Sequence, residues 1–368
     1  MRIVFITEAL VLGGKERRLL ELIRYLQDTT DYEMLLVITD SAIHYDYVRD
    51  FKIKIEVLER KYFKRDPLFF FKLFNVYRKF RPDIIHSWSS MTTCYSIPYA
   101  VVHKTPIVDG EINDSRRGFS TLSLRGLIFT LNTYFSKVIL ANSHSGLRAY
   151  RMTSPKARVI YNGIHLGRFT NLPDPLRVRA HYGVSSRYCV AMAASFDDRK
   201  NYNLFIDTAK LMYRLRTDVT FIGIGDGPNL QAVRERVSRE QIQNVLLPGK
   251  LTKVEELMNC ADVGLLTTGV DYHEGISNAL MEFMALGKPV ITNDFSGGSK
   301  ELVEDGGSGY VVSSQEPEYF VSLIDELLQD ESRRRTMGQC GKSSIAERFT
   351  LAIMGSRFVN LYSEILST

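Results

Sequence analysis

Residues 273–291, "HEGISNALMEFMALGKPVI", place two carboxylates, Glu274 and Glu282, eight positions apart around a predicted helix start. Ser277 lies between them and is a residue type that caps helices. A glycine near the end of the stretch is typical of a helix stop, and the closing Lys-Pro-Val-Ile predicts a strand. The stretch therefore predicts a loop, a helix and a strand, with one acid in the loop and the other inside the helix.

The chemistry of this helix start favours a ligand that combines phosphate with hydroxyl groups. If Ser277 caps the helix, the amides of Asn278, Ala279 and Leu280 point outward, and such a helix start binds phosphate. Acids beside a phosphate suit hydroxyls, because a carboxylate accepts two hydrogen bonds from a vicinal diol. The pattern fits a nucleotide-sugar, with the sugar on one acid and the ribose on the other. The alternative is a capped helix whose early glutamate offsets the helix dipole, worth about 0.3–1 kcal/mol.

The composition is typical of a globular protein with more than one domain. The chain has 368 residues, of which 45% are hydrophobic and 24% charged. Thr7 and Glu8 interrupt the first apolar run, so no signal peptide is predicted, and no later stretch predicts a spanning helix. The four cysteines lie far apart without metal-ligand spacing, which favours a reducing cytoplasm.

The positive charge is concentrated in the first half of the chain. The net charge is +5, but residues 1–165 hold 25 Lys and Arg against 16 Asp and Glu, and the rest holds 22 against 26. A basic half favours a polyanionic partner, either a phosphate-rich ligand or an anionic membrane surface. Nucleic acid is not expected, because the excess is modest and no binding motif is present.

Short apolar runs alternate with helical periodicity along most of the chain, which predicts parallel sheets with helices on both faces. The Pro- and Asn-rich segment 166–175 predicts a linker between two such halves. A ligand is expected in the cleft that faces the carboxyl ends of the strands. The predicted strands are 2–7, 34–39, 53–58, 83–88, 106–111, 137–143, 158–164, 188–195, 219–225, 245–249, 262–268 and 289–294, and the predicted helices include 66–80, 203–215, 229–240 and 253–261.

Further motifs fall at turns between a predicted strand and the next helix. Gly13 and Gly14 follow the first strand, where glycine allows close approach to a ligand. Lys200, in "SFDDRKN", stands where a phosphate-binding cation is usual. The turns "GIGDGP" (223–228) and "NDFSGGSKEL" (293–302) add glycines, although the first is not the dinucleotide fingerprint. Each motif alone is more often structural, but their shared position in both halves favours a phosphate ligand.

Together these motifs resemble the retaining glycosyltransferases of family 4, and the resemblance covers nearly the whole chain. "EGISNALME" matches the family's signature of two glutamates separated by seven residues, and "GGKER", "VIYNGIHLGRF", "GIGDGP" and "GGSKELVEDGGSGYVV" resemble other family segments. The resemblance implies the GT-B fold, an α/β fold of two Rossmann-like, doubly wound parallel-sheet domains that face each other across a cleft. It implies an acceptor-side domain at 1–165, completed by the helix 350–368, and a nucleotide-sugar donor-binding domain at 166–349.

The resemblance also implies a role for each matching position. Glu282 would hold the donor ribose, Glu274 would contact the transferred sugar near the reacting carbon, and Lys200 would neutralise the diphosphate. Gly13 and Gly14 would let the first domain close over the phosphates. The implied donor-binding set further includes Arg199, Gly225, Lys250, Leu251, Ile276, Ser277, Asn278 and Ala279, and the backbone near Lys250 and Leu251 would border the base.

The sequence departs from the family pattern at two places. Ala194-Ser195-Phe196 stands where the family often has Gly-Arg-Leu, so Arg199 is the candidate for the missing arginine of an Arg–Lys clamp. No histidine follows the strand 106–111; Glu111 or Asn113 could serve there, Glu111 as the catalytic candidate and Asn113 on the acceptor side. His86 ends another strand and is predicted either to line the acceptor side or to be a satisfied strand-end histidine.

The implied reaction is transfer, with retention, of a sugar from a nucleoside-diphosphate sugar to a saccharide or lipid-linked saccharide in polysaccharide or glycolipid assembly. A UDP-sugar is favoured, with a GDP-sugar as the alternative. No metal or other cofactor is expected, because Lys200 and the helix amides would stabilise the leaving diphosphate, and Asp197-Asp198 are more typical of a turn. The alternatives are a nucleotide-sugar epimerase of the same architecture and a non-catalytic sugar-nucleotide-binding protein; the missing fingerprint disfavours a NAD-dependent oxidoreductase.

Residues 60–82, "RKYFKRDPLFFFKLFNVYRKFRP", mix basic and aromatic side chains. Such a segment is predicted either to rest on an anionic membrane near a lipid-linked acceptor or to be a surface helix that buries one aromatic face. The expected location is therefore the cytoplasm, at the inner face of the cell membrane if the first alternative holds.

Overall fold

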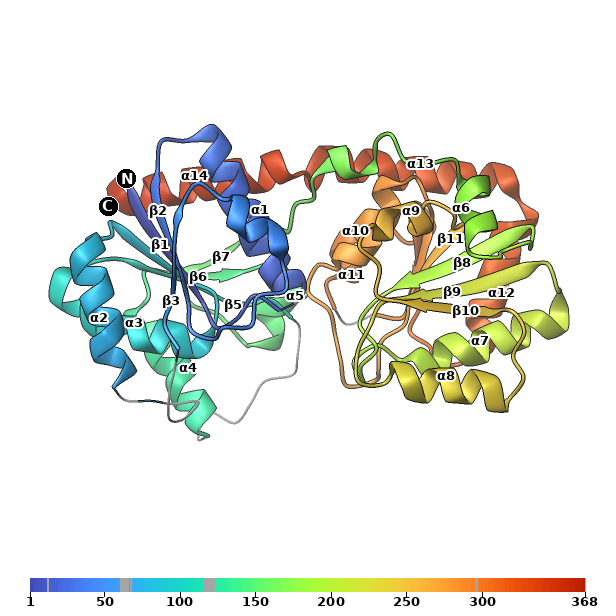
Figure 1. Cartoon of the computed structure of the whole chain (residues 1–368), viewed down its shortest axis with the longest axis horizontal. Helices are drawn as coiled ribbons and strands as arrows, with labels where there is room; N and C mark the ends of the chain where they lie inside the picture. Colours follow the sequence, from blue (N-terminus) through green and yellow to red (C-terminus); the bar gives the residue numbers. More distant parts are fainter. Residues whose placement is uncertain (12, 60–65, 67, 115–122, 295–296, 368) are drawn as a thin grey trace. The chain divides into compact units, whose positions relative to one another are not determined.

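The computed structural model describes residues 1–11, 13–59, 66, 68–114, 123–294 and 297–367. The chain divides into two units (Figure 1). Unit 1 consists of Met1–Gly163 and Leu351–Thr368, and unit 2 is Ile164–Thr350. The polypeptide therefore leaves unit 1 once, builds all of unit 2, and returns to unit 1 for its last helix.

In the described part of unit 1, seven parallel strands form one sheet in the order β3-β2-β1-β4-β5-β6-β7. The strands are runs of apolar residues because both faces of the sheet are covered. In β1, for example, Ile3 and Phe5 enter one core, and Val4 and Ile6 enter the other. The strands are β1 (Arg2–Thr7), β2 (Glu33–Ile38), β3 (Lys54–Val57), β4 (Ile84–Ser87), β5 (Ile107–Ile112), β6 (Val138–Ala141) and β7 (Ala157–Val159).

The helices of unit 1 cover its sheet from both sides. Helices α1 and α14 lie beside each other over one face, and α2 and α3 over the other (Figure 1). Helices α4 and α5 pack near β6. The described helical segments are α1 (Gly14–Thr29), η1 (Asp46–Asp50), α2 (Phe69–Phe80), α3 (Ser90–His103), α4 (Leu124–Phe135), α5 (His144–Ala149) and α14 (Leu351–Ser367).

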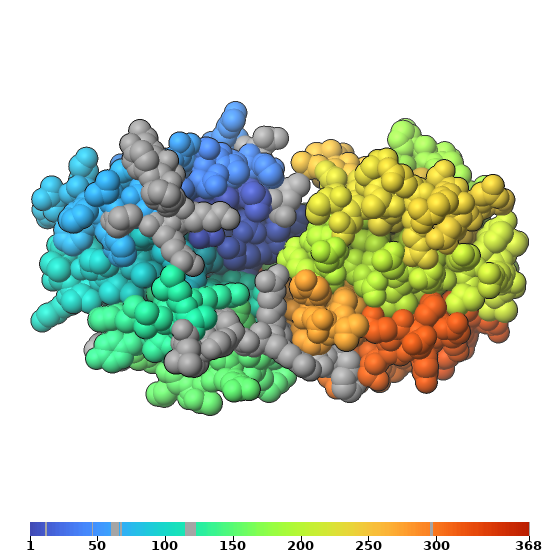
Figure 2. All heavy atoms as spheres, turned by 90° about the horizontal axis from the view of Figure 1, so that it is seen from below, coloured from blue at the N-terminus to red at the C-terminus, as the bar shows by residue number. Residues whose placement is uncertain are grey.

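In the described part of unit 2, six parallel strands run in the order β10-β9-β8-β11-β12-β13. Helix α8 buries Leu230 and Val233, and its remainder is part of the surface of unit 2, yellow in Figure 2. The strands are β8 (Tyr188–Ala193), β9 (Val219–Ile224), β10 (Val245–Gly249), β11 (Val263–Leu266), β12 (Val290–Thr292) and β13 (Gly309–Val311). The helical segments are η2 (Leu166–Phe169), α6 (Pro175–His181), α7 (Tyr202–Leu215), α8 (Leu230–Arg239), α9 (Val254–Met258), α10 (Asn278–Ala285), α11 (Ser299–Leu302), α12 (Pro317–Gln329) and α13 (Glu331–Arg348).

The strand order of each unit contains one reversal that predicts where a ligand binds. In unit 1 the order reverses between β1 and β4, and in unit 2 between β8 and β11. The connections that leave these two neighbouring strands turn away to opposite sides, which opens a crevice at their carboxyl ends. The residues that follow β1, β4, β8 and β11 therefore have the positions from which a ligand would be contacted.

Some predicted elements differ from those observed. The strand predicted at 158–164 ends at Val159, because its one described neighbour, β6, ends at Ala141. The predicted linker 166–175 contains the helical turn η2 and the start of α6.

The helix predicted at 66–80 begins at Phe69, after a turn in which the Asp66 carboxylate accepts a hydrogen bond from the Leu68 amide. Residues 60–65 and 67 of the predicted membrane segment lie outside the described residues. The helix α2 buries Phe69, Leu73 and Tyr77, which agrees with the prediction of a surface helix that buries one aromatic face.

Candidate functional site

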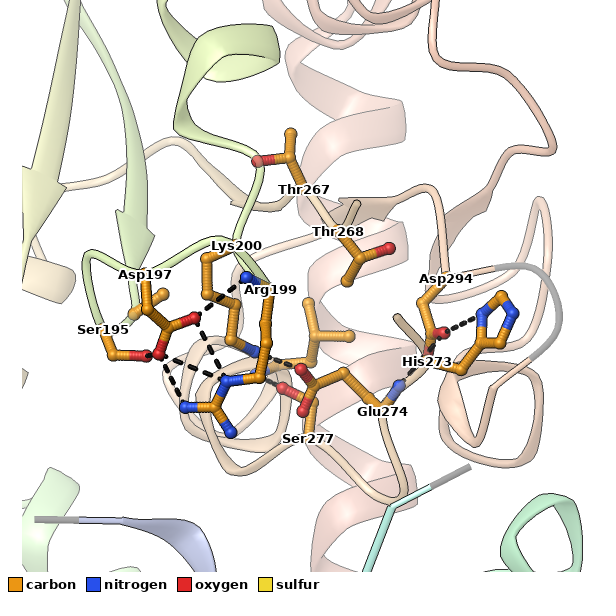
Figure 3. A network of polar contacts seen from close by, with 12 residues as sticks. Ser195, Asp197, Arg199, Lys200, Thr267, Thr268, His273, Glu274, Ser277 and Asp294 are labelled. Atoms are coloured by element: carbon orange, nitrogen blue, oxygen red, sulfur yellow. Dashed lines mark hydrogen bonds and ion pairs between the residues drawn. The ribbon is translucent and has the colours of Figure 1, made fainter. Parts of the chain in front are cut away.

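Lys200 and Glu274 meet at the point where the strand order of unit 2 reverses. Lys200 follows β8 and Glu274 follows β11, and the two strands are neighbours in the sheet. The Lys200 ammonium donates to Glu274 Oε1 and forms an ion pair with it (Figure 3). Their side chains are 12% and 26% exposed. The pair therefore occupies the usual ligand-binding place of such a sheet while staying partly open to solvent.

The start of α10 has the predicted cap. Ser277 has an extended backbone, and its hydroxyl accepts a hydrogen bond from the Leu280 amide at 3.4 Å. Asn278 and Ala279 form the first turn of the helix, and Ile276 is buried just before it. The interpretation of Ser277 as the cap is confirmed, and α10 begins directly after the loop that carries Glu274.

Asp294, which the sequence analysis did not single out, fixes the loop that carries Glu274. The Asp294 side chain is fully buried after β12. It accepts hydrogen bonds from the Glu274 amide at 3.2 Å and from the Ser299 hydroxyl at 2.7 Å, and His273 Nδ1 lies 3.5 Å from it (Figure 3). Burial raises the pKa of Asp294 above its ordinary value, although the contact with His273 opposes this shift. The Gly298 amide also donates to the Glu274 carbonyl at 2.9 Å, so two turns hold the loop together.

Arg199 lies next to Lys200 but is engaged by Asp197. The Arg199 guanidinium donates to Asp197 Oδ1 at 3.1 Å and to Oδ2 at 2.6 Å, and the Ser195 hydroxyl donates to the same carboxylate (Figure 3). Burial opposes ionisation of Asp197, but these hydrogen bonds outweigh it and lower its pKa. The predicted use of Arg199 as the clamp arginine therefore requires that it leave Asp197, and Asp197 has the turn role predicted for it.

The turn "GIGDGP" packs against the end of β8. Gly225 has φ +145°, and a Cβ there would lie 2.0 Å from the Ala194 carbonyl oxygen. Its amide donates to the Gly249 carbonyl at 3.1 Å, at the end of β10. Lys250 and Leu251 follow immediately, exposed and half-buried respectively. A glycine is thus required at 225 for close packing against the residue after β8, and the predicted base-binding backbone follows the end of β10 next to this turn.

Glu282 is held by a basic side chain. Its side chain is nearly buried, on the inner side of α10. Arg168 Nη1 donates to Glu282 Oε1 at 2.9 Å, and Arg168 Nη2 lies 3.4 Å from Glu255 Oε2. The carboxylate predicted to hold the ribose is therefore already oriented by a side chain from the segment that the sequence indicated as a linker.

In unit 1, Gly13 and Gly14 form the turn between β1 and α1. Gly13 has an extended backbone and precedes the helix, and Gly14 is its first residue. The Tyr45 hydroxyl accepts from the Gly13 amide at 3.2 Å and donates to the Gly13 carbonyl at 3.1 Å. A Cβ at Gly13 would lie 2.4 Å from Glu16 Oε2. The turn is therefore held by tyrosine, and a side chain at position 13 would require the Glu16 carboxylate to move.

Glu111 and Asn113 occupy the end of β5. The Glu111 amide donates to Asp109 Oδ1 at 3.1 Å, and the Asn113 carboxamide oxygen accepts from Arg18 at 3.2 Å. Burial raises the pKa of Glu111, against a hydrogen bond from Ser90 that lowers it. Burial and the charge of Glu111 raise the pKa of Asp109 to about 8. This end of the strand is thus a site where a carboxyl group retains its proton at neutral pH.

The structure contradicts the acceptor-side prediction for His86. Its ring is fully buried among Phe5, Trp88 and Phe358, and its Nδ1 lies 2.7 Å from the Tyr362 hydroxyl of α14. Burial and the neighbouring Arg18 lower the pKa of His86 well below its ordinary value, so the ring is neutral. The alternative prediction of a satisfied strand-end histidine holds only in part, because Nδ1 has a hydrogen-bond partner, whereas the buried Nε2 has none among the described residues.

Two family models match the chain in tandem. The model of Glycosyltransferase Family 4 matches residues 12–168, and that of Glycosyl transferases group 1 matches residues 179–344. The chain belongs to the family 4 glycosyltransferases. The resemblance read from "EGISNALME" and the other motifs is therefore confirmed.

Solved structures confirm the GT-B fold of this family 4 chain. HepE from Anabaena, solved in complex with UDP-glucose, superposes with a TM-score of 0.86 at 21% identity over 99% of this chain and 100% of that one. Sucrose-phosphate synthase from Thermosynechococcus elongatus superposes with a TM-score of 0.78 at 16% identity over 100% and 99% of the two chains. At these identities the likeness concerns the fold alone.

Curated relatives match a part of the chain. N-acetyl-alpha-D-glucosaminyl L-malate synthase of Bacillus anthracis is 27% identical over 237 residues, which are 63% of this chain and 60% of the relative. A GDP-mannose-dependent alpha-(1-6)-phosphatidylinositol monomannoside mannosyltransferase of Mycolicibacterium smegmatis is 27% identical over 213 residues, 55% of this chain and 54% of the relative. The chain thus spans between half and two thirds of the length of these relatives.

Neither a metal-binding cluster nor a membrane-spanning helix is present among the described residues. Among the residues that the structure describes, no cluster of three or more His, Cys, Asp or Glu side chains is arranged to hold a metal ion. Within the same residues, no helix has both the length and the apolar character needed to cross a bilayer.

Proposed function

We propose that this family 4 chain is a retaining glycosyltransferase that uses a nucleoside-diphosphate sugar. The observation that carries the proposal is the Lys200–Glu274 ion pair at the reversal of strand order, beside the capped start of α10. The cation after β8, together with a helix N-terminus and two acids within residues 274–282, matches the diphosphate and the hydroxyl groups of such a donor.

In the proposed reaction, the bond between the anomeric carbon and the diphosphate oxygen breaks, and an acceptor hydroxyl attacks from the same face. The nucleoside diphosphate leaves with additional negative charge, which Lys200 and the first amides of α10 stabilise. The acceptor's proton passes to the departing diphosphate, so that charge is conserved. Glu274 orients the transferred sugar, and Glu282 binds the ribose.

We propose that UDP is the donor nucleotide and that a saccharide or lipid-linked saccharide accepts the sugar in polysaccharide or glycolipid assembly. UDP is favoured because HepE, which shares the fold over nearly the whole chain, was solved with UDP-glucose. GDP stays the alternative, because a relative with higher identity is named for GDP-mannose.

Calorimetry with UDP, GDP, ADP and NAD on the wild type and on Glu282→Ala tests the donor site. One nucleoside diphosphate should bind, and the variant should bind it more weakly by about the 1.5–3 kcal/mol of a charged hydrogen bond. Incubation with the matching nucleotide-sugars and analysis of the products then tests the reaction. Free nucleotide with a new glycoside supports transfer; an epimerised sugar without free nucleotide, or binding without turnover, would instead establish one of the two alternatives.

We further propose that the reaction needs no divalent metal, because Lys200 and the helix amides supply the positive charge. Activity after exhaustive treatment with a chelator supports this. Inactivation by the chelator that Mg²⁺ reverses would contradict it.

A peripheral contact between residues 60–82 and an anionic membrane is proposed as the route to a lipid-linked acceptor, at the inner face of the cell membrane. Within α2, Phe71 is 72% exposed, and Arg78 and Lys79 are exposed on the same helix. Such a pairing of aromatic and basic side chains suits a negatively charged bilayer. Sedimentation with liposomes should show preference for anionic over zwitterionic lipid, and equal binding would remove the proposal.

A further inference from the structure

Arg168 joins two acidic side chains from two different helices of unit 2. Its guanidinium donates to Glu282 of α10 at 2.9 Å and lies 3.4 Å from Glu255 of α9. The Arg168 side chain is 25% exposed, whereas that of Glu282 is 5% exposed. The arginine thus contacts the more buried of the two signature glutamates and is itself partly open to solvent.

The backbone around Arg168 is fixed within unit 2 directly after the chain enters it. The Ile164 amide donates to the Phe349 carbonyl at 2.9 Å, and Ile164 forms an isolated parallel bridge with Thr350. The Arg168 amide donates to the His165 carbonyl at 3.2 Å inside the turn η2. The guanidinium also lies over the Phe169 ring, 5.4 Å from its centroid. Arg168 is therefore held from both its backbone and its side chain.

A carboxylate as buried as that of Glu282 needs a counter-charge to remain a good acceptor. A carboxylate has about four acceptor sites, and one N–H of Arg168 occupies a site on Oε1. The planar fork of arginine can hold two carboxylates at once, which fixes the rotation of each. A carboxylate whose rotation is fixed presents its acceptor sites in a defined direction, as two neighbouring hydroxyls require.

We propose that Arg168 is a positioning residue that orients Glu282 toward the ribose diol and so gives the donor site its preference for a ribonucleotide over a 2′-deoxyribonucleotide. This inference rests on the proposed function, since it assumes that Glu282 accepts from the ribose. Arg168 touches neither the transferred sugar nor the diphosphate in this assignment. Its effect reaches the ligand through the orientation of one carboxylate.

The test compares the affinities for a nucleoside diphosphate and for its 2′-deoxy form by calorimetry. The probes are UDP and 2′-deoxy-UDP, or the GDP pair if GDP is the base that binds. The proteins are the wild type, Glu282→Gln, Arg168→Ala and the double variant. Arg168→Lys is added because it keeps the positive charge and loses the fork, in case Arg168→Ala does not fold.

A matched control is available in the same unit. Arg216 also joins two acids, with Asp218 Oδ1 at 2.7 Å and Asp325 Oδ1 at 3.0 Å, and its side chain is 21% exposed. Arg216→Ala should therefore lower thermal stability about as much as Arg168→Ala. It should leave the ratio of ribo to 2′-deoxy affinity unchanged, because it is bonded to neither Glu282 nor Glu274.

The wild type should prefer the ribonucleotide by about tenfold or more, as expected for a hydroxyl bonded to a carboxylate. Arg168→Ala should lose most of that preference, Arg168→Lys should lose part of it, and the double variant should lose no more than Glu282→Gln alone. If Glu282→Gln loses the preference while Arg168→Ala and Arg168→Lys keep it, the inference is overturned and the donor site stands. If Arg168→Ala binds the ribonucleotide more tightly than the wild type, Arg168 competes with the ribose, and the inference is also overturned. If the wild type binds no nucleoside diphosphate, the proposed function fails and the inference fails with it.

Discussion

Each unit carries two acids near the carboxyl end of a strand, but their neighbours differ. In unit 1, Asp109 and Glu111 lie two residues apart at the end of β5, and the Glu111 amide donates to the Asp109 carboxylate. In unit 2, Glu274 and Glu282 flank the start of α10, and each is bonded to a lysine or an arginine. The two acids of unit 1 thus lie next to each other near a strand end, whereas each acid of unit 2 is paired with its own cation.

The difference shows how the environment of a carboxyl group decides what it can do. Burial beside another acid raises the pKa of Asp109 to about 8, so this group carries a proton at neutral pH. Burial beside a cation keeps a carboxylate available as an acceptor for ligand hydroxyls. Unit 1 therefore presents a protonated carboxyl group, and unit 2 presents two carboxylates, one of them paired with the lysine that we propose binds the diphosphate.

Removing Lys200, the cation paired with Glu274 in unit 2, should have the largest effect. Lys200→Ala should lower kcat/KM on the order of 10²–10³-fold, because the leaving diphosphate loses a preorganised charge. Steady-state kinetics with the donor identified by calorimetry measures this. Lys210→Ala is the control, since Lys210 forms an ion pair with Glu240 on the same unit at 2.9 Å. Equal losses in the two variants would show that the Lys200–Glu274 pair has no special role.

Loosening the loop that carries Glu274, which Asp294 holds in place, should have the next largest effect. Asp294→Asn replaces one buried oxygen by an N–H group that faces the Ser299 amide or the Glu274 amide, both of which are donors. We expect a loss of about 1–3 kcal/mol in the free energy of unfolding and weaker donor binding. Urea unfolding and calorimetry measure the two quantities. Asp305→Asn, at an exposed carboxylate bonded to the Val311 amide at 2.9 Å, should cost less than about 1 kcal/mol.

The protonated carboxyl of unit 1 should make stability fall as the pH rises. Because the folded pKa of Asp109 is raised, the folded chain binds more protons than the unfolded chain up to about pH 8, and stability decreases with pH over that range. The lowered pKa of His86 acts in the opposite sense, but only below its ordinary value of 6.5. Between pH 6.5 and 8.5 the loss should be about 1–2 kcal/mol.

Asp109→Asn is the variant that isolates this effect, because its carboxamide oxygen can still accept from Thr93 and from the Glu111 amide. Urea unfolding at several pH values should give a flatter profile for the variant than for the wild type. A wild-type stability that rises between pH 6.5 and 8.5 would show that the Asp109 carboxyl is ionised throughout.

The smallest effect is expected from replacing Arg199. This variant tests whether Arg199 joins Lys200 in binding the diphosphate. Its side chain is half exposed and bonded to Asp197, and exposed ion pairs contribute about 0.2–1 kcal/mol. Arg199→Ala should therefore change stability by less than about 1 kcal/mol and should affect diphosphate affinity far less than Lys200→Ala. A comparable loss of affinity would mean that Arg199 leaves Asp197 to join the clamp.

Local patterns in the sequence predicted much of this arrangement. The alternation of apolar runs and helices indicated both sheets, and the Ser277 cap followed from four consecutive residues. Lys200 was predicted at a turn between a strand and a helix and Glu274 in a loop before a helix, each from its local pattern. These predictions succeed because each depends on residues that are close in sequence or on a rule that holds for all parallel sheets.

Other parts of the site depend on contacts between distant residues. Arg168 and Glu282 are separated by 114 positions, and the composition around Arg168 indicated only a linker. Asp294 acquires its importance from burial and from the loop that it anchors, 20 positions away. The two alternatives for His86 could not be separated from the sequence, because its burial depends on α14, 276 positions later in the chain. No local periodicity carries this information.

The return of the chain to unit 1 also matters for synthesis. Helix α14 supplies Phe358 and Tyr362 to the core that covers one face of the first sheet, and it follows the whole of unit 2 in the sequence. On the ribosome, all the strands of unit 1 emerge long before the helix that shields them, while unit 2 emerges complete. Until that helix arrives, His86 and Trp88 lack their ring contacts with Phe358, and the part of the sheet face that α14 covers stays open to chaperones or to neighbouring nascent chains.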